Sequence, residues 1–287
     1  MDRPVSDITV SICCITYNHE EYIAQTIEGF LMQKTNFKIE ILIGEDCSTD
    51  QTGEIVKEYT ANHPSVIRLI TSETNVGPTK NVKRVVEAAT GKYVAFCEGD
   101  DFWTDERKLQ KQIDLLENDA NIAICCHYAR VIDDSDALVY EAEELIPFEY
   151  TYNDLLLGKR HETRTSSIVC RNSPELKQIF ENEWYHRTFG SDVFLKLYII
   201  ANTGGKIYVI PEVMSTYRLH RGGIFSMIDP KIRKGRMLND FNIIVNHFSY
   251  STRLKRKLLF NYFTQFFLFE LRNFKLRSAY NTISSLI

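Results

Sequence analysis

The sequence predicts an α/β protein with a mostly parallel sheet flanked by helices, followed by a helical extension at the C-terminal end. Two observations carry this prediction. Over residues 1–126, continuous apolar runs alternate with segments whose apolar residues recur every three or four positions, which is typical of βαβ units. Beyond residue 228 the strand pattern gives way to helical segments rich in basic and aromatic residues. We therefore expect one domain at 1–228, with halves 1–126 and 127–228, and an extension at 229–287.

Five apolar runs in the first half are predicted as strands, because continuous runs rich in β-branched residues suit strands that are buried on both faces. They are residues 8–16, 39–44, 66–71, 92–97 and 122–126. Helices are expected between them, at 22–31, 48–63, 77–90 and 105–119. Sheets of this kind bind ligands at the carboxyl ends of their strands, so the segments after the second and fourth strands should face one crevice.

The second half is less regular. Residues 133–165 are acidic and irregular, and we interpret them as a lobe over the crevice. We expect a strand at 166–171, a helix that starts at Ser173-Pro174 and another helix at 191–205. Residues 206–220 are predicted as a pair of strands, in which Pro211 marks an edge or a bulge.

The composition is that of an ordinary globular protein, with 44% hydrophobic and 25% charged residues. A formal net charge of −4 disfavours a nucleic-acid partner. The seven cysteines contain no CxxC pair and lie mostly in apolar runs, which favours reduced thiols in a cytoplasmic protein. Neither a signal-peptide core nor a membrane-spanning run is found, so we expect a soluble protein, or one held peripherally on the inner face of the plasma membrane.

The segment "RLKRKLLFNYFTQFFLFELRNFKLR" (253–277) surrounds a single acid, Glu270, with basic and aromatic residues. Two interpretations stay open. The helices of this segment pack on the rest of the chain or on a partner subunit, which would allow an oligomer. Alternatively, they lie on an anionic membrane surface, where basic and aromatic side chains are both stabilised.

Three carboxylates follow the fourth predicted strand in "KYVAFCEGDDFWTD": Glu98, Asp100 and Asp101. Like charges this close oppose each other's ionisation unless a positive charge lies between them. We therefore predict a divalent cation, Mn²⁺ or Mg²⁺, that itself holds a diphosphate. The competing interpretation is a cap for the helix that begins near Asp105.

Two common phosphate-binding motifs are absent, namely GxGxxG after the first strand and GxxxxGK anywhere in the chain. The first strand instead ends in "ITYNHEEY", and the acids Glu20 and Glu21 at the start of the next helix would repel a phosphate. A diphosphate must then be neutralised by something other than this helix end. This observation again points to a cation at the carboxylate cluster.

Several segments, in this order, resemble the family-2 glycosyltransferases with the GT-A fold: "VSICCITYNHEEYIAQTIEGFLMQ", "EILIGEDCSTDQT", "TNVGPTKN", "ATGKYVAFCEGDDFW", "GSDVFLKLYI" and "GGKIYVIPEVMSTYRLHRGG". The resemblance covers residues 8–225 and implies a nucleotide-sugar site. It implies that the following residues bind the nucleoside and ribose: Thr16, Tyr17, Asn18, Glu45, Asp46, Asn75, Lys80 and Asn81. Asp46 is expected to accept from the ring N–H of uracil, an edge that thymine shares.

The resemblance also assigns the diphosphate end of this site. Glu98-Gly99-Asp100 occupies the position of the family's Asp-any-Asp signature, so Asp100 is expected to ligate the metal and Glu98 to lie near the ribose. Asp101 and His220 are further candidate ligands. Arg218 is a candidate for binding the diphosphate, although an internal brace is an open alternative. Trp103 and Trp184 are candidates for stacking on sugar faces or for core packing.

In the family's inverting reaction, the acceptor hydroxyl attacks from the face opposite the departing diphosphate, and a base takes its proton. Asp192 in "FGSDVF" matches the family's base, with a simple helix cap as the alternative. The resemblance thus implies a metal-dependent inverting transferase that moves a sugar from a UDP-sugar to a saccharide or glycolipid acceptor, as in surface polysaccharide or glycolipid synthesis. A nucleotidyltransferase that makes sugar nucleotides, a retaining transferase and a non-catalytic nucleotide-sugar-binding module are the competing functions.

Overall fold

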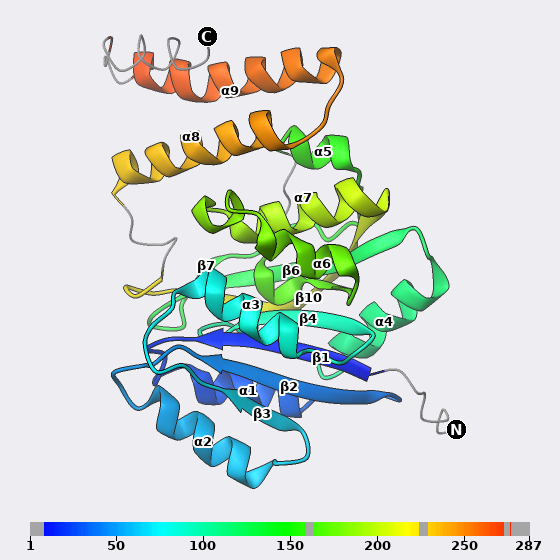
Figure 1. Ribbon diagram of the computed structural model, residues 1–287, viewed down its shortest axis with the longest axis vertical. Coiled ribbons are helices and arrows are strands. Elements are labelled where there is room, and N and C mark those ends of the chain that lie inside the picture. The colour runs from blue at the N-terminus through cyan, green and yellow to red at the C-terminus, as the bar shows by residue number, and fades with distance from the viewer. Residues whose placement is uncertain (1–8, 159–162, 224–228, 273–275, 277–287) are drawn as a thin grey trace.

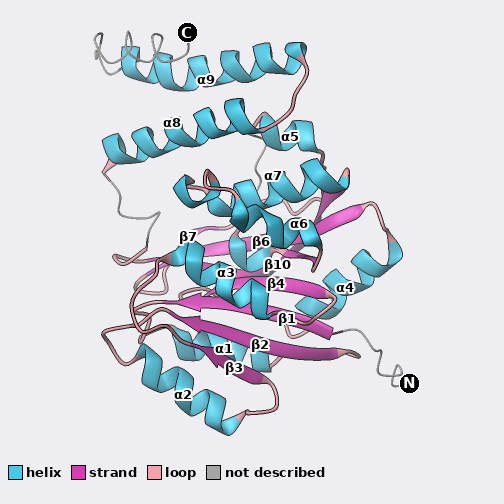
Figure 2. Ribbon diagram, in the orientation of Figure 1, coloured by secondary structure: helices cyan, strands magenta, loops and turns pink. Residues whose placement is uncertain are grey.

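The computed structural model describes residues 9–158, 163–223, 229–272 and 276. A ten-stranded sheet runs through the molecule, with helices on both of its faces (Figures 1 and 2). Its main path has the order β3-β2-β1-β4-β9-β6-β10-β5, while β7 pairs with β6 and β8 pairs with β10. The prediction of an α/β fold built on a mostly parallel sheet is confirmed in outline.

The first half forms the parallel part of the sheet. Its elements are β1 (Thr9–Thr16), α1 (Ile23–Leu31), β2 (Lys38–Glu45), α2 (Thr52–Asn62), β3 (Ile67–Ile70), α3 (Pro78–Ala88) and β4 (Tyr93–Glu98). Strands β3, β2, β1 and β4 pair in parallel, with Thr16 of β1 beside Glu45 of β2 and Ile15 beside Glu98 of β4. The carboxyl ends of these strands therefore meet at one edge, as the sequence predicts.

Successive residues of β1 face opposite sides of the sheet, and both sides are covered, which explains why apolar residues occur at neighbouring positions of this strand. Val10, Ile12 and Cys14 pack in the core beneath α1, α2 and α4 (Lys108–Asn118), whereas Cys13 packs in the core on the α3 side. All four side chains are buried. A strand that shows only one face to a core would instead alternate apolar and polar residues.

The second half adds antiparallel pairs to the sheet. It contains β5 (Phe102–Trp103), β6 (Ile122–Asp133), β7 (Leu138–Tyr140), β8 (Phe148–Tyr150), α5 (Tyr152–Leu156), β9 (Val169–Arg171), α6 (Pro174–Gln178), α7 (Ser191–Thr203) and β10 (Lys206–Leu219). Three 3-10 turns connect them: Thr165–Ser167, Ile179–Glu181 and Tyr185–Arg187. Strand β9 lies antiparallel between β4 and β6 and so joins the two halves of the sheet.

Two expectations for this half need correction. Residues 206–220 form not a pair of strands but the single strand β10, whose register against β6 shifts between Ile210 and Val213. Pro211 lies in this shift and cannot donate a ladder hydrogen bond, so it marks the bulge but not a chain reversal. The stretch 133–158 is not irregular, because it holds β7, β8 and α5, while residues 159–162 of the expected lobe fall outside the described chain.

The C-terminal extension consists of α8 (Pro230–His247) and α9 (Thr252–Arg272), which are stacked beyond α5 and α7 (Figure 1). Phe241, Ile243 and Ile244 of α8 belong to the same core as Trp184 and Phe194 of the second half. Helix α9 packs on α8, with the Tyr262 and Phe241 rings stacked 3.6 Å apart. The prediction of a helical extension is confirmed, and none of the described helices is long and apolar enough to span a bilayer.

Candidate active site

A pocket with a cavity volume of about 920 Å³ opens at the carboxyl ends of the parallel strands. One wall consists of the ends of β1 and β4, the segment 75–82 and two glycines that follow β10, Gly222 and Gly223. A second wall consists of segment 185–196 together with Arg236 of α8. Segment 163–165 connects the two walls, because Thr165 hydrogen-bonds Glu98 and Thr163 accepts from Lys196. Topology explains the position of the pocket, because the loops that follow adjacent parallel strands converge there.

Three side chains form a candidate metal site at one end of this pocket: His19 and Asp100, which line it, and His220, which is buried beside them and is not among the lining residues of the described chain. The ligand atoms of His19, Asp100 and His220 lie within 4.8 Å of one another. The Oδ2 atom of Asp100 is 2.9 Å from Nε2 of His220 and 3.8 Å from Nε2 of His19. These residues come from the loop after β1, the turn after β4 and the end of β10, so only the folded sheet brings them together. Two imidazoles and a carboxylate fit a divalent transition metal.

The carboxylates after β4 are not equally charged. Burial, followed by the charges of Asp100 and Asp192, raises the pKa of Glu98 to about 8. Burial alone would raise the pKa of Asp100, but the hydrogen bond donated by His220 and the charges of His19 and His220 outweigh it, and the pKa is held below its usual range. Near neutral pH, Asp100 is therefore the ionised member and Glu98 is mostly protonated.

Asp101 lies apart from the candidate metal site. Its side chain is fully buried, and Oδ1 accepts the backbone N–H of Arg218 at 3.0 Å. Burial and then the charges of Asp100 and Glu98 raise the pKa of this carboxyl well above its usual value. Asp101 is not among the residues that line the pocket in the described chain. The raised pKa values of Glu98 and Asp101 therefore reduce the repulsion among the three carboxyl groups even before a cation binds.

The end of the pocket that is predicted to bind the nucleoside is organised by Asp46. Its Oδ1 accepts the backbone N–H of Val76 and its Oδ2 that of Gly77, both at 2.9 Å, so the carboxylate holds the loop before α3 in place. Asp46 also lines the pocket, together with Asn75 and Lys80. Tyr17 stands at the same end with 40% of its surface exposed, where its ring can stack on a base.

Other predicted donor-site residues have structural contacts. Thr16 and Asn81 line the pocket, and Asn81 donates to the carbonyl of Gly44 at 2.7 Å, which ties α3 to the end of β2. Glu45 accepts the backbone N–H of Ser48, and Asn18, at a φ of 54°, accepts that of Thr49. Neither Glu45 nor Asn18 is among the pocket-lining residues of the described chain.

Gly99 lies where the turn after β4 packs closely against the end of β1. A Cβ atom at Gly99 would lie 2.6 Å from Oγ1 of Thr16 and 3.0 Å from Nδ1 of His19. A side chain larger than hydrogen would therefore push His19 away from Asp100. The glycine in the middle of Glu98-Gly99-Asp100 is required by the close approach of two neighbouring segments.

The second wall contains Asp192, in the first turn of α7. Its Oδ2 lies 3.0 Å from the ammonium of Lys196, a side chain that is almost fully buried and that also donates to the carbonyl of Thr163. This contact holds the carboxylate in a fixed orientation. The charge of Asp192 reaches across the pocket far enough to contribute to the raised pKa of Glu98.

The structure gives Arg218 and the two tryptophans internal positions. Arg218 is buried and forms an ion pair with Asp136. It also donates to Gln25 and lies over the ring of Tyr22, so it supports the residues behind the pocket and is not among its described lining residues. Trp103 and Trp184 are only 2% and 7% exposed and belong to the two cores, which excludes stacking of either indole on a bound sugar.

The sequence interpretation missed His19. It treated "TYNHEEY" as a poor phosphate site because of Glu20 and Glu21, and overlooked the imidazole between the strand end and these acids. The available signal was position: His19 follows the end of β1, which is the neighbour of β4 in the predicted sheet. Arg164, Arg187 and Arg236 also line the pocket and were not predicted.

Comparison with known proteins decides the family. Residues 11–174 match the model of glycosyl transferase family 2. The chain belongs to this family. An uncharacterized protein of Mycobacterium tuberculosis is 38% identical over 223 residues, which are 75% of this chain and 60% of that relative. The chain thus spans about 60% of the length of this family-2 relative.

Two solved structures share the family-2 fold. S. aureus TarS in complex with UDP-GlcNAc superposes with a TM-score of 0.66 at 19% identity, over 90% of this chain and 73% of TarS. The mannosyltransferase PcManGT of Pyrobaculum calidifontis, in complex with GDP-Man and Mn²⁺, gives a TM-score of 0.64 at 16% identity, over 99% of this chain and 76% of PcManGT. The GT-A fold and the family expected from the sequence are confirmed.

Proposed function

We propose that this family-2 chain is a metal-dependent, inverting glycosyltransferase that moves a sugar from a UDP-sugar to an acceptor hydroxyl in the synthesis of a surface polysaccharide or glycolipid. One observation carries the proposal. A cluster of metal-ligating side chains and a held carboxylate, Asp192, lie on different walls of one pocket at the carboxyl edge of the sheet. Inverting transfer needs this separation, because the leaving group and the base act on opposite faces of the sugar.

His19, Asp100 and His220 are the residues that would hold the cation. A divalent cation here supplies Lewis-acid stabilisation of the charge that develops on the leaving diphosphate. The two imidazoles favour Mn²⁺ over Mg²⁺, which prefers oxygen ligands and water. The Mn²⁺ in the PcManGT complex is consistent with this choice.

Asp192 is the base of the proposed reaction. The ammonium of Lys196 at 3.0 Å keeps its carboxylate oriented, and the carboxylate accepts the proton of the acceptor hydroxyl as that oxygen attacks the anomeric carbon. Glu98, which ends the strand before the metal ligand Asp100 and lines the pocket, is placed to bind a hydroxyl of the donor ribose or sugar.

The uracil preference rests on Asp46 and Tyr17, and the UDP-GlcNAc complex of TarS supports it. The GDP-Man complex of PcManGT shows that other bases occur on this fold. The test is a screen of UDP-, dTDP- and GDP-sugars for thermal stabilisation with and without Mn²⁺. A ligand at 100 times its Kd raises the unfolding free energy by about 2.7 kcal/mol. We expect this gain for a UDP-sugar only when Mn²⁺ is present.

The same screen tests the alternatives. If only a GDP-sugar stabilises the protein, the proposed preference for uracil is wrong. If stabilisation is equal without Mn²⁺, the proposed metal site is wrong. A nucleotidyltransferase would instead release pyrophosphate from a nucleoside triphosphate and a sugar phosphate, which a coupled assay detects. A binding module would be stabilised but would release no UDP with any acceptor.

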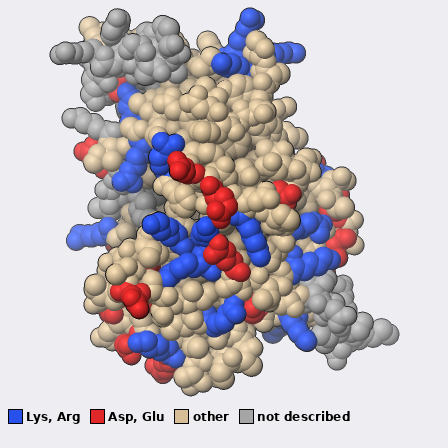
Figure 3. Space-filling view, in the orientation of Figure 1, with Lys and Arg blue, Asp and Glu red and all other residues tan. Residues whose placement is uncertain are grey.

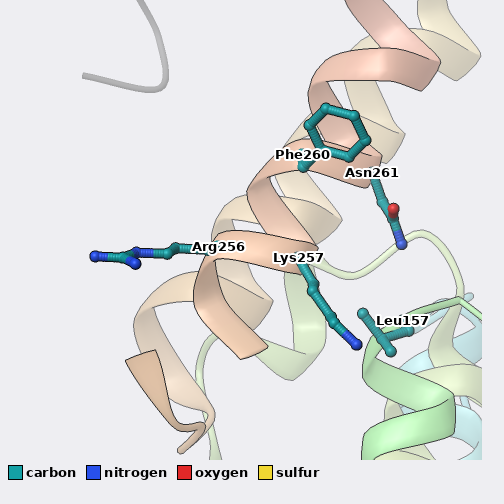
Figure 4. A pocket seen from close by; sticks show the side chains of 5 residues that line it. All are labelled: Leu157, Arg256, Lys257, Phe260 and Asn261. Atoms are coloured by element: carbon teal, nitrogen blue, oxygen red, sulfur yellow. The ribbon is translucent and has the colours of Figure 1, made fainter. Parts of the chain in front are cut away.

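We also propose a peripheral membrane contact through α9. Arg256, Lys257 and Phe260 lie around a hollow of about 580 Å³ beside Leu157 (Figure 4). Phe260 is 66% exposed, and both neighbouring basic side chains are exposed too. Exposed cations beside an exposed aromatic ring complement an anionic lipid surface. Packing of α9 on α8 through Tyr262 leaves this face outward.

A further inference from the structure

The pocket continues past Asp192 to a wall that the family model does not cover. Arg187, Thr188, Phe189 and Gly190 line this part, and Arg236 of α8 closes it. All of them lie beyond residue 174, where the match to the family model ends. This wall is on the Asp192 side of the pocket, where the acceptor of the proposed reaction must enter.

Helix α8 holds this wall in place. The carboxylate of Asp240 accepts the backbone N–H of Phe189 at 2.8 Å and that of Gly190 at 3.0 Å. The neighbouring Asn239 donates to the carbonyl of Arg187 at 2.8 Å. Three contacts from one turn of α8 thus fix the backbone on which Arg187 stands. The C-terminal extension is part of the pocket and not only a support for it.

Among the residues that the structure describes, the two guanidinium groups of this wall form no ion pair with a carboxylate. Within the described chain, no Asp or Glu oxygen lies within ion-pair distance of Arg187 or Arg236, whereas Lys196 pairs with Asp192 and Arg84 with Asp46. Arg236 instead lies over the ring of Phe189, 5.4 Å from its centroid. The Lys and Arg side chains over α3 in Figure 3 differ from these two arginines, because acidic side chains lie among them and Lys83 pairs with Glu87 and Glu181.

The donor does not account for these charges. Its diphosphate belongs at His19, Asp100 and His220, on the other wall, where the cation offsets its charge. Guanidinium groups present several N–H donors in a planar fork, which suits the oxygens of a phosphate and its double charge. Two of them on the acceptor wall therefore select for an anionic acceptor.

Building on the proposed function, we infer that the acceptor carries a phosphate group, and that Arg187 and Arg236 bind this phosphate while the accepting hydroxyl reaches Asp192. The ring of Phe189 supports the guanidinium of Arg236 from below. The phosphate belongs either to a soluble saccharide phosphate or to a lipid headgroup, and both present the same oxygens.

The test uses the full chain saturated with UDP and Mn²⁺, so that the donor site is filled. Glycerol 3-phosphate, a phosphate monoester, is titrated by calorimetry, and vesicles of phosphatidylglycerol, whose headgroup is a singly charged phosphodiester, are tested by sedimentation. We expect the wild type to bind one or both. Arg187→Gln and Arg236→Gln should each weaken glycerol 3-phosphate binding about tenfold, and the double variant should abolish it. Vesicle binding is compared in an Arg256→Gln, Lys257→Gln background, so that the proposed contact through α9 does not contribute. Lys57→Gln on the exposed face of α2 is the matched control.

Each outcome of this experiment either supports or overturns the inference of a phosphate-bearing acceptor. Absence of binding by the wild type to both probes overturns the inference, as does unchanged binding by the double variant. If the two substitutions weaken UDP binding instead, the arginines belong to the donor site and the acceptor assignment is wrong. Binding to glycerol 3-phosphate supports a soluble acceptor, and binding to vesicles alone supports a lipid-linked one. UDP binding of the wild type, measured in the same samples, separates failure of the inference from failure of the proposed function.

Discussion

The two walls of the pocket are held by different kinds of interaction. The donor wall stands on the ends of β1, β2 and β4, whose main chains pair in continuous register. The acceptor wall stands on a 3-10 turn, the segment that follows it and the first turn of α7, held mainly by side chains of α8. Sheet pairing fixes the first wall wherever this fold occurs, whereas a few side-chain contacts fix the second.

This difference between the two walls indicates which part of the pocket can vary among members of the family. The residues proposed to bind nucleotide and cation lie at the ends of the paired strands, within or next to the matched range 11–174, except for His220. The residues proposed to face the acceptor are held by α8, which is outside this range. Acceptor choice can therefore change without disturbing the donor site. The following predictions test whether the walls are separable in this way.

The largest effect is expected from Asp100→Asn on the donor wall. The substitution removes the ionised oxygen ligand between His19 and His220 while keeping the size of the side chain. We expect loss of Mn²⁺-dependent UDP binding by at least 100-fold, because the metal and the diphosphate are bound together. Calorimetry with UDP in the presence and absence of Mn²⁺ measures it.

Glu58→Gln, an exposed carboxylate on α2, is the control for the loss of one charge. It should bind UDP like the wild type. Unchanged affinity in Asp100→Asn would refute the metal site and, with it, the separation of the pocket into a donor and an acceptor wall.

A loss of a different kind, in turnover but not in donor affinity, is expected from Asp192→Asn on the acceptor wall. General-base catalysis contributes about 10²- to 10⁴-fold, so turnover should fall by this factor. Donor affinity should stay within about twofold of the wild type, because Asp192 and Asp100 lie on different walls. Lys196 loses its partner in this variant, so the thermal midpoint is measured as well. Normal turnover in a folded Asp192→Asn protein would rule out this residue as the base.

The sequence predicts the donor wall better than the acceptor wall, for a physical reason. Strands buried on both faces leave long apolar runs, and the polar residues that interrupt them mark the strand ends, so Asp46 and Asp100 were found. His19 was missed because its role depends on a contact with the end of β10, about 200 residues away, and no local pattern encodes such a contact. The arginines of the acceptor wall were missed for the same reason.

Neighbouring residues with the same chemistry also separate only in three dimensions. Asp100 and Asp101 are equivalent in the sequence, yet one points into the pocket and the other accepts a backbone N–H in the interior. In the turn after a strand, each successive side chain points in a new direction. The sequence does not show at which residue the strand ends and the turn starts, so it does not show which carboxylate faces the pocket. Likewise, Pro211 predicted an interruption in β10 but not whether the chain turns back there.

The third prediction concerns the packing behind the donor wall. Lys108 is fully buried, donates to Gln112 at 2.8 Å and lies 3.9 Å from the ring centroid of Trp103, just after the acid cluster. Burial lowers the pKa of this ammonium from 10.5 to about 7. The folded state thus favours the neutral amine, and the unfolded chain binds more protons between about pH 7 and 10.5. The free energy of unfolding should therefore rise with pH in this window and be insensitive to Lys108 below it.

Lys108→Met keeps the length of the side chain and removes this titration. At pH 7 the variant should be more stable than the wild type, and the difference should shrink by about 1.4 kcal/mol for each pH unit up to pH 9. Urea unfolding of both proteins across this range measures the difference, in which other titrating groups cancel. A difference independent of pH would show that Lys108 stays charged in the fold, and that the core behind the donor wall is wetter than its burial indicates.

The smallest effect is expected at the outer surface of the acceptor half, where α9 presents its exposed face. Each basic residue near an anionic bilayer contributes about 1 kcal/mol to binding. Arg256→Gln with Lys257→Gln should thus weaken sedimentation with phosphatidylglycerol vesicles by about 10- to 30-fold at low salt. UDP binding should be unchanged, because these side chains lie on α9, away from the donor wall. Arg130→Gln, an exposed cation on β6, should sediment like the wild type. If the wild type itself fails to bind these vesicles at low salt, α9 does not contact membranes, and the acceptor must come to the pocket from solution.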